Sequence, residues 1–239
     1  MKYNNYVFDL YGTLIDIRTD EQQYSFWRKI SYQLKKKGID KTPAFLRQEY
    51  HDLIKRQLLN NSHEYGEADV IKAFAEMADG KLSDSELHEF AWLFRQKSTS
   101  LLKLYDGVTE LLEMIKSEKG KIILLSNAQS SFTLPELRML GIDKYFDHLF
   151  ISSDYGVRKP DKDFWQIMID ETGIKPNESV MIGNDYEADL STAERLGFDT
   201  IYIHQAISPK LNDILKRKIN TCTEKIMDGD VKKLIEYLK

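Results

Sequence analysis

Hydrophobic positions along the chain follow two patterns that alternate. Largely apolar runs occur at residues 6–8, 122–125, 149–151, 180–182 and 200–203, and such short runs predict buried strands. Beyond residue 103 these runs are separated by stretches in which apolar residues recur every three or four positions, which predicts amphipathic helices. Strands that alternate with helices in this way predict a mostly parallel sheet with helices on both faces.

Residues 18–102 carry the helical pattern alone. Apolar stripes at helical spacing predict four helices, and Ser83 followed by Glu86 is a capping-box sequence for the last one. The stripes consist of Phe26, Trp27, Ile30 and Leu34, of Leu46, Tyr50, Leu53, Ile54 and Leu58, of Val70, Ile71, Phe74, Ala75 and Met77, and of Leu87, Phe90, Ala91 and Phe94. We expect no strand in this block, which predicts an all-helical insertion after the first strand.

The C-terminal part of the chain contains two more stretches with a helical pattern. They lie at residues 210–218 and 231–238 and predict surface helices. The short apolar segment between them, residues 219–222, is expected to form an edge strand.

Several predicted strands lead directly into polar residues. The first leads into Asp9 and Gly12, the second into Ser126 and the fourth into Asp185. Ligands of open α/β sheets bind beyond the carboxyl ends of the strands, so these residues are expected to lie at one edge of the sheet. Gly12 allows a sharp turn that brings backbone N–H groups close to an anion. The pattern therefore predicts a ligand site at this edge.

Composition narrows the possible partners. The chain has 239 residues, a formal net charge of −4 and no basic run, which argues against nucleic acid or an anionic membrane as a partner. It contains neither a signal-peptide pattern nor an apolar stretch of about twenty residues, so we expect a cytoplasmic protein without membrane association. The single cysteine, Cys222, cannot form an internal disulfide, which fits a reducing compartment. The sequence gives no indication of oligomeric state.

Four short sequences, in this order along the chain, resemble the motifs of the haloacid dehalogenase-like hydrolase superfamily. They are Asp9-Leu10-Tyr11-Gly12-Thr13-Leu14, Leu124-Leu125-Ser126-Asn127, Lys159-Pro160 and Ile182-Gly183-Asn184-Asp185-Tyr186-Glu187-Ala188-Asp189. Each motif is short, but their common order argues against chance agreement. The resemblance implies a Rossmann-like hydrolase core of residues 1–17 and 103–239, with a helical cap of residues 18–102 that closes over the site.

The resemblance also implies a reaction. Members of this superfamily attack the substrate with an aspartate at the position of Asp9. Attack on phosphorus gives an aspartyl phosphate that water then hydrolyses, so we expect a hydrolase acting on a small phosphorylated metabolite. The remaining catalytic candidates are Tyr11, Thr13, Ser126 and Lys159, and the candidates for substrate binding are Gly12, Ser126, Asn127 and Lys159.

A phosphate dianion beside Asp9 requires charge neutralisation. Asp185 and Asp189 lie one helical turn apart at a strand-to-helix junction, where acids are also favoured by the helix dipole. Their carboxylates, with that of Asp9 and the backbone carbonyl of Tyr11, form a set of hard oxygen donors that suits Mg2+. Asp185 is the better ligand candidate of the two junction acids, and Lys159 is expected to pair with both phosphate and Asp9.

Tyr11 departs from the pattern of the phosphatases, which carry a second aspartate there as general acid and base. A tyrosine with a pKa of about 10 is a poor base at neutral pH. The sequence around Tyr11 is also similar to that of L-2-haloacid dehalogenases, which displace halide from carbon and need no metal. Those enzymes carry an arginine for the halide early in the cap, and neither Arg28 nor Arg47 lies in a recognisable motif.

Three functions therefore remain open. The acidic fourth motif favours a Mg2+-dependent phosphatase, because the cluster of Asp185, Glu187 and Asp189 calls for a cation. A metal-independent L-2-haloacid dehalogenase is the first alternative. The second is a relative that binds a phosphorylated ligand with little or no turnover. The cap residues that would select the substrate are not identified by the sequence.

Overall fold

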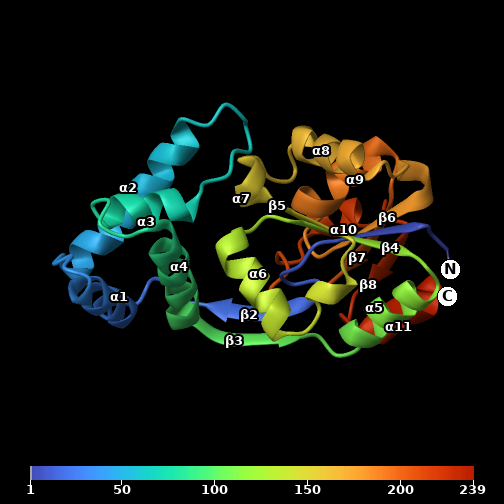
Figure 1. Cartoon of the computed structure of the whole chain (residues 1–239). Coiled ribbons are helices and arrows are strands. Elements are labelled where there is room, and N and C mark those ends of the chain that lie inside the picture. Colours follow the sequence, from blue (N-terminus) through green and yellow to red (C-terminus); the bar gives the residue numbers. More distant parts are fainter. Residues whose placement is uncertain (1) are drawn as a thin grey trace.

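The computed structural model describes residues 2–239 and contains a six-stranded sheet in which all neighbouring strands are parallel (Figure 1). The strands are β1 (Asn5–Phe8), β4 (Lys121–Ser126), β5 (His148–Ile151), β6 (Ser179–Gly183), β7 (Asp199–Ile203) and β8 (Glu224–Ile226). Their order is β5-β4-β1-β6-β7-β8, which places β1 in the middle of the sheet. The predicted parallel sheet is thus confirmed.

Helices cover both faces of this sheet, and each face has its own apolar core. One face packs against α5 (Val108–Ser117) and α11 (Val231–Leu238), and the other packs against α8 (Lys162–Thr172), α9 (Ser191–Leu196) and α10 (Asp213–Lys218). Tyr6 and Phe8 of β1 belong to the first core and Val7 to the second, and all three are fully buried. A strand buried on both faces is apolar throughout, which explains the unbroken run.

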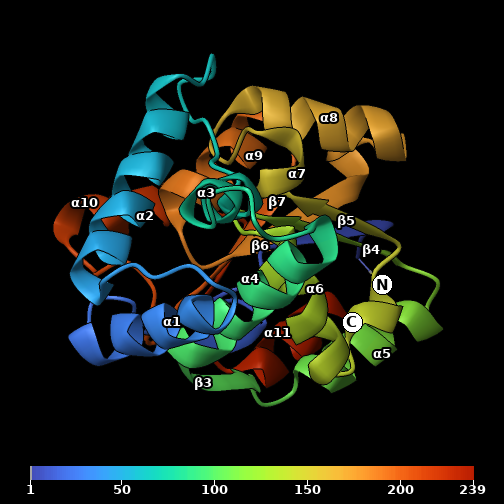
Figure 2. The same cartoon turned by 60° about the vertical axis from the view of Figure 1, so that its left-hand side comes forward.

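The four helices expected in residues 18–102 are present. They are α1 (Tyr24–Lys36), α2 (Pro43–Leu59), α3 (Val70–Met77) and α4 (Asp84–Ser98). The predicted stripes form a third core in which Trp27, Phe74 and Phe94 are fully buried, and Ser83 and Glu86 form the expected capping box. Figures 1 and 2 show these helices grouped beside the sheet. Among residues 2–239, no helix is both long and apolar enough to cross a membrane.

The expectation of no strand within residues 18–102 is wrong at both ends of the block. The strands β2 (Ile15–Thr19) and β3 (Thr99–Leu104) pair antiparallel and form a ribbon that joins the helices to the sheet (Figure 1). Apolar and polar residues do alternate along β2, but over only five residues. The helical pattern that follows hid this short signal.

The C-terminal edge strand also differs from the expected one. It is β8, which pairs with β7, whereas residues 219–222 form a turn after α10. Ile219 and Cys222 are apolar because both are buried in the second core, not because they lie in a strand. The helix before them begins at Asp213, where Asn212 caps it, and not at residue 210.

Shorter elements complete the chain. They are α6 (Ser130–Met139), α7 (Ser152–Tyr155), the 3-10 turns Asp143–Tyr145 and Pro176–Glu178, and a π-helical turn, η3 (Tyr186–Leu190), which leads into α9. The helix α6 packs on two sides. Its Leu137 belongs to the first core of the sheet, and its Phe132 belongs to the core of α1–α4. It therefore lies between the sheet and the helical block.

Candidate active site

A buried ammonium joins two carboxylates at the carboxyl ends of β1 and β6. Lys159 Nζ lies 2.9 Å from Asp9 Oδ1 and 2.7 Å from Asp189 Oδ1, and its side chain has no exposed surface. Burial alone lowers the pKa of Lys159, but the carboxylates of Asp189 and Asp9 outweigh it and the pKa is raised. The side chain is therefore a fixed positive charge beside Asp9.

Asp189 is committed to contacts within the protein. Besides Lys159, it accepts a hydrogen bond from the Asp185 backbone N–H at its Oδ2 (3.0 Å). A Cβ on Gly183 would come within 2.4 Å of this Oδ2, so glycine is required for the close approach. Burial raises the pKa of Asp189 to about 7, and the nearby Asp9 carboxylate acts in the same direction.

The Asp9 carboxylate is held at both oxygens. Lys159 binds Oδ1, and the Thr13 hydroxyl donates to Oδ2 (3.1 Å). In the amide orientation that satisfies both ends of Asn184, its nitrogen donates to Asp9 Oδ2 (3.3 Å) and to the Tyr11 carbonyl oxygen (3.2 Å). The predicted juxtaposition of Asp9, Thr13 and Lys159 is present.

Asn184 was not among the site candidates, although it directly follows strand β6. That position at a strand end was the signal that could have identified it. Its side chain also explains Gly12, which has a φ of +86° and where a Cβ would lie 2.3 Å from a terminal atom of the Asn184 side-chain amide. Gly12 therefore allows both the turn and the close contact with Asn184.

Asp185 caps the π-helical turn η3. Its Oδ1 accepts hydrogen bonds from the N–H groups of Glu187 (3.0 Å) and Ala188 (3.2 Å). Its Oδ2 accepts no hydrogen bond from any of residues 2–239. Of the two junction acids, Asp185 thus has the oxygen that is available to a cation.

The carboxylates of the three predicted acidic ligands, Asp9, Asp185 and Asp189, do not form a compact cluster in this structure. Among the described residues, the group whose ligand atoms all lie within 4.8 Å of one another is His63, Asp161 and Asp163. This group lies between the loop after α2 and the start of α8 and does not include Asp9, Asp185 or Asp189.

The end of β4 brings two polar side chains to the site, the hydroxyl of Ser126 and the amide of Asn127. Ser126 Oγ is buried and has no hydrogen-bond partner among the described residues. The Asn127 side chain accepts from Lys159 N–H (2.8 Å) and donates to the Lys159 carbonyl (2.9 Å). Ser126 can therefore donate to a ligand, whereas Asn127 holds the backbone of Lys159 in place.

The Tyr11 side chain forms its contacts with helix α6. Its hydroxyl donates to Glu136 Oε2 (2.5 Å) and lies 2.9 Å from Thr133 Oγ1. Burial raises the pKa of Tyr11, and the Glu136 carboxylate adds to this effect. At neutral pH the phenol is protonated and cannot act as a base.

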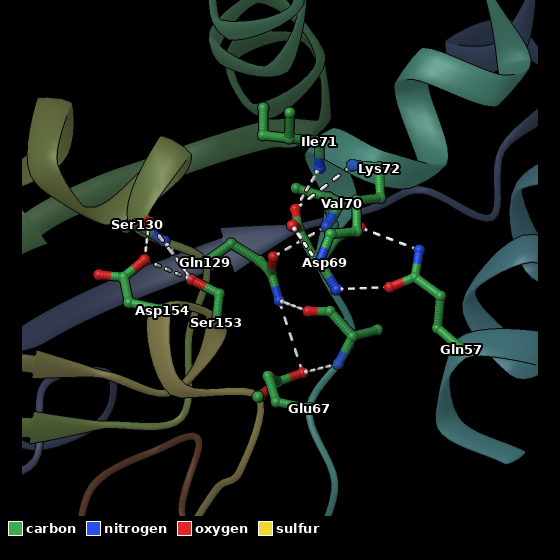
Figure 3. A network of polar contacts seen from close by, with 12 residues as sticks. Gln57, Glu67, Asp69, Val70, Ile71, Lys72, Gln129, Ser130, Ser153 and Asp154 are labelled. Atoms are coloured by element: carbon green, nitrogen blue, oxygen red, sulfur yellow. Dashed lines mark hydrogen bonds and ion pairs between the residues drawn. The ribbon is translucent and has the colours of Figure 1, made fainter. Parts of the chain in front are cut away.

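The helical block contacts the site region through the segment between α2 and α3. Gln129, which follows the Ser126–Asn127 turn, donates to the Ala68 carbonyl (2.7 Å) and accepts from Val70 N–H (3.1 Å). Figure 3 shows Gln129 reaching this segment, with Glu67 beside it. Glu67 in turn accepts a hydrogen bond from Ser152 Oγ (2.7 Å). These contacts fasten residues 67–70 to Gln129, three residues after Ser126, and to Ser152 of α7.

The arginines considered for a halide site lie elsewhere. Arg28 and Arg47 are exposed, and Arg47 binds Gln22. The arginine that approaches Tyr11 is Arg95 of α4, whose guanidinium carbon lies 5.4 Å from the centroid of the phenol ring. Its place in the sequence, in the last turn of a helix, gave no signal for this role.

Comparisons with known proteins identify the family to which the chain is similar. The model of the haloacid dehalogenase-like hydrolase family matches residues 3–197. A phosphorylated carbohydrates phosphatase of Thermotoga maritima is 30% identical over 115 residues, which is 48% of this chain and 51% of that protein. A (S)-2-haloacid dehalogenase of Burkholderia cepacia is 28% identical over 125 residues, or 52% of this chain and 54% of that protein. The chain spans about half the length of these curated relatives.

Solved structures resemble the chain over nearly its full length. A HAD phosphatase from Thermococcus onnurineus superposes with a TM-score of 0.63 at 19% identity and covers 98% of this chain and 97% of its own. A HAD-hydrolase from Bacillus subtilis, solved bound to magnesium, gives a TM-score of 0.57 at 16% identity. The match covers 100% of this chain and 99% of the Bacillus subtilis chain. At these identities the likeness concerns the fold.

Proposed function

The chain belongs to the haloacid dehalogenase-like hydrolase family, and we propose that it is a Mg2+-dependent phosphatase acting on a small phosphorylated metabolite through an aspartyl-phosphate intermediate. The observation that carries this proposal is the buried, unpartnered hydroxyl of Ser126 at the end of β4, which pairs with β1, the strand that precedes Asp9. Buried hydroxyl groups are normally hydrogen-bonded, so Ser126 Oγ is a donor that a ligand could use. A phosphate oxygen is the acceptor that it would bind.

Asp9 is the proposed nucleophile. Lys159 holds one carboxylate oxygen, while Thr13 and Asn184 hold the other, so the attacking group is fixed before the substrate binds. The ammonium of Lys159 and the hydroxyl of Ser126 would bind phosphate oxygens, and Asn127 would act indirectly by holding Lys159. The protonated Tyr11 takes no part in proton transfer in this scheme.

The donors at the site fit Mg2+. Asp185 has a carboxylate oxygen without a protein partner, and the carboxylate of Asp9 and the carbonyl of Tyr11 are further hard oxygen donors. When bound, Mg2+ would neutralise the charge of the phosphate. Asp189 would support the site by orienting Lys159 and the amide of Asp185. A hydrolase from Bacillus subtilis with the same fold was solved with magnesium bound, which supports the choice of ion.

We further propose that residues 1–17 and 103–239 form the hydrolase core and that residues 18–102 form a cap. The ribbon of β2 and β3 would be the connection between them. We also propose a cytoplasmic location and no nucleic-acid partner, since the net charge is −4.

A dehalogenase remains the second candidate because of Tyr11 and the relative from Burkholderia cepacia. Two observations weigh against it. Arg28 and Arg47 are exposed, and Arg95 is already paired with Glu136 (2.6 Å). Neither arrangement leaves a free, buried guanidinium for halide.

A screen of phosphorylated metabolites and 2-haloacids against the purified protein, with and without Mg2+, tests the proposal. We expect phosphate release that requires Mg2+ and is absent in Asp9→Asn. Chloride release from 2-chloropropionate without metal would establish the dehalogenase instead. Binding of a phosphorylated compound without product would indicate the inactive relative.

A further inference from the structure

One buried carboxylate connects the helical block with the loop that carries Asp9. Glu136, in the middle of α6, is 1% exposed. Its Oε1 accepts a hydrogen bond from Arg95 Nε of α4 (2.6 Å), and its Oε2 accepts one from the Tyr11 hydroxyl. The two oxygens of one side chain thus bind two segments that are far apart in sequence.

Arg95 is packed as well as paired. Its guanidinium carbon lies 5.4 Å from the ring centroid of Tyr11 and 5.3 Å from that of Phe132, within the range of cation–π contacts. Its side chain is 12% exposed. A buried charge at an interface is costly unless its partner is in place, so Arg95 and Glu136 together favour one docked position of α4 on α6.

The loop that contains Tyr11 is connected to the Asp9 carboxylate through Thr13. Tyr11 precedes Gly12 and Thr13, and the Thr13 hydroxyl binds Asp9 Oδ2. The loop is closed by backbone hydrogen bonds from Gly12 N–H to the Ile15 carbonyl (2.8 Å) and from Leu14 N–H to the Leu10 carbonyl (2.8 Å). These hydrogen bonds hold residues 10–15 together, so we expect a shift of Tyr11 to move Thr13 and to change its hydrogen bond to Asp9.

We propose that Arg95 is a positioning residue, which couples the docking of the helical block on α6 to the orientation of Asp9 through Glu136 and Tyr11. In this chain the hydroxyl of Tyr11 binds Glu136 and so takes part in the docking of the helical block on α6, instead of transferring a proton. The inference rests on Asp9 being the reacting group, and it holds for a phosphatase and a dehalogenase alike.

A second contact of α6 provides an internal comparison. Gln129, just before α6, also fastens the helical block, but it binds Ala68 and Val70 and does not touch Tyr11. Loss of Gln129 would loosen docking without breaking the link to Asp9. Arg56 of α2 is a matched arginine control, because its ion pair with Glu76 is exposed and lies within the block.

A double-mutant cycle on kcat/KM tests the coupling. We expect Arg95→Met and Tyr11→Phe each to lower kcat/KM by roughly five- to fiftyfold, mainly through kcat, and the double variant to fall no further than the worse single variant. Arg95→Lys should recover part of the loss. Gln129→Ala combined with Tyr11→Phe should be additive, and Arg56→Met should match wild type. Additive losses for Arg95→Met and Tyr11→Phe, or effects on KM alone, would overturn the proposal.

A second measurement does not depend on activity. Deuterium exchange of the hydrogen-bonded amides of Gly12, Leu14 and Ile15 should be faster in Arg95→Met and Tyr11→Phe than in wild type and Arg56→Met. If Arg95→Met does not fold, the double variant Arg95→Met/Glu136→Gln is used in its place in both assays, because it also removes the buried charge of Glu136 that Arg95→Met leaves unpaired. Unchanged exchange at these amides would refute the coupling, whatever the substrate is.

Discussion

Lys159 and Asp9 form an ion pair in which the ammonium has no exposed surface, and Asp189 binds the same ammonium from the other side. Removal of the cation would leave two buried carboxylates facing each other. We therefore expect Lys159→Met to lower the free energy of unfolding at pH 7 by about 3–5 kcal/mol. Urea unfolding measures this loss.

The matched control for Lys159→Met is Lys175→Met. The Lys175 side chain is 70% exposed and pairs with Glu178, so its loss should cost less than about 1 kcal/mol. Equal stabilities for Lys159→Met and Lys175→Met would show that the buried ion pair does not contribute as described.

Ser126→Ala should separate stability from activity. Because the buried Ser126 hydroxyl has no protein partner, its removal should leave the melting temperature unchanged or raise it. Phosphatase kcat/KM should fall by roughly ten- to a hundredfold, since a donor to the phosphate is lost. Differential scanning calorimetry and initial rates measure the two effects.

Ser179→Ala is the converse control for Ser126. Ser179 is equally buried, but its hydroxyl donates to the Lys175 carbonyl (2.6 Å) and accepts from Asn5 Nδ2 (3.0 Å). We expect a loss of about 1–3 kcal/mol in stability with little change in activity. A larger stability loss in Ser126→Ala than in Ser179→Ala would contradict the assignment of a free hydroxyl.

Asp185→Asn should weaken Mg2+ binding without unfolding η3. The amide oxygen can still cap the turn, whereas the charge that attracts the ion is lost. We expect the affinity measured by calorimetry to fall by at least about tenfold, and Asp189→Asn to have the smaller effect because both Asp189 oxygens are already engaged. Wild-type affinity in Asp185→Asn would remove Asp185 from the site.

The capping box of α4 predicts a dependence of stability on pH. The hydrogen bond from Lys37, followed by those from Ser83, lowers the pKa of Glu86 to about 2. A lowered carboxyl pKa stabilises the fold above the unfolded value of about 4.3 and loses this effect as the pH falls towards 2. The melting temperature of wild type should thus be higher than that of Glu86→Ala at pH 7, and the difference between the two should disappear as the pH falls towards 2. A gap that persists at pH 2, or one equally large for the exposed Glu89→Ala, would be evidence against this role.

The sequence predicted the parts of this fold that depend on local pattern. Strand β1 is buried on both faces, so its apolar run was unambiguous, and Asp9 at its end could be placed by the general rule for parallel sheets. The ribbon strand β2 was missed because three of its five residues are polar and the segment is short. Its pairing partner β3 lies some eighty residues away, beyond the reach of periodicity.

The roles of individual site residues depended on tertiary contacts. The sequence pattern predicts that Asn127 donates to phosphate. Its side-chain amide instead forms hydrogen bonds with the backbone of Lys159, thirty-two residues away. Arg95 and Glu136 occur in ordinary amphipathic helices, and only the packing of α4 on α6 brings them to Tyr11. Such relationships follow from the fold and leave no local signature in the sequence.

The central claim is that water attacks phosphorus in an aspartyl phosphate at Asp9, and turnover of an aryl phosphate in 18O-water tests it directly. The account predicts 18O in the released phosphate, an unlabelled peptide containing Asp9, and no turnover by Asp9→Asn. A dehalogenase would hydrolyse an ester by attack on the carboxyl carbon, so on 2-chloropropionate it would carry 18O into Asp9. Label in the Asp9 peptide with no phosphate release from any phosphorylated compound, or full turnover by folded Asp9→Asn, would contradict the account.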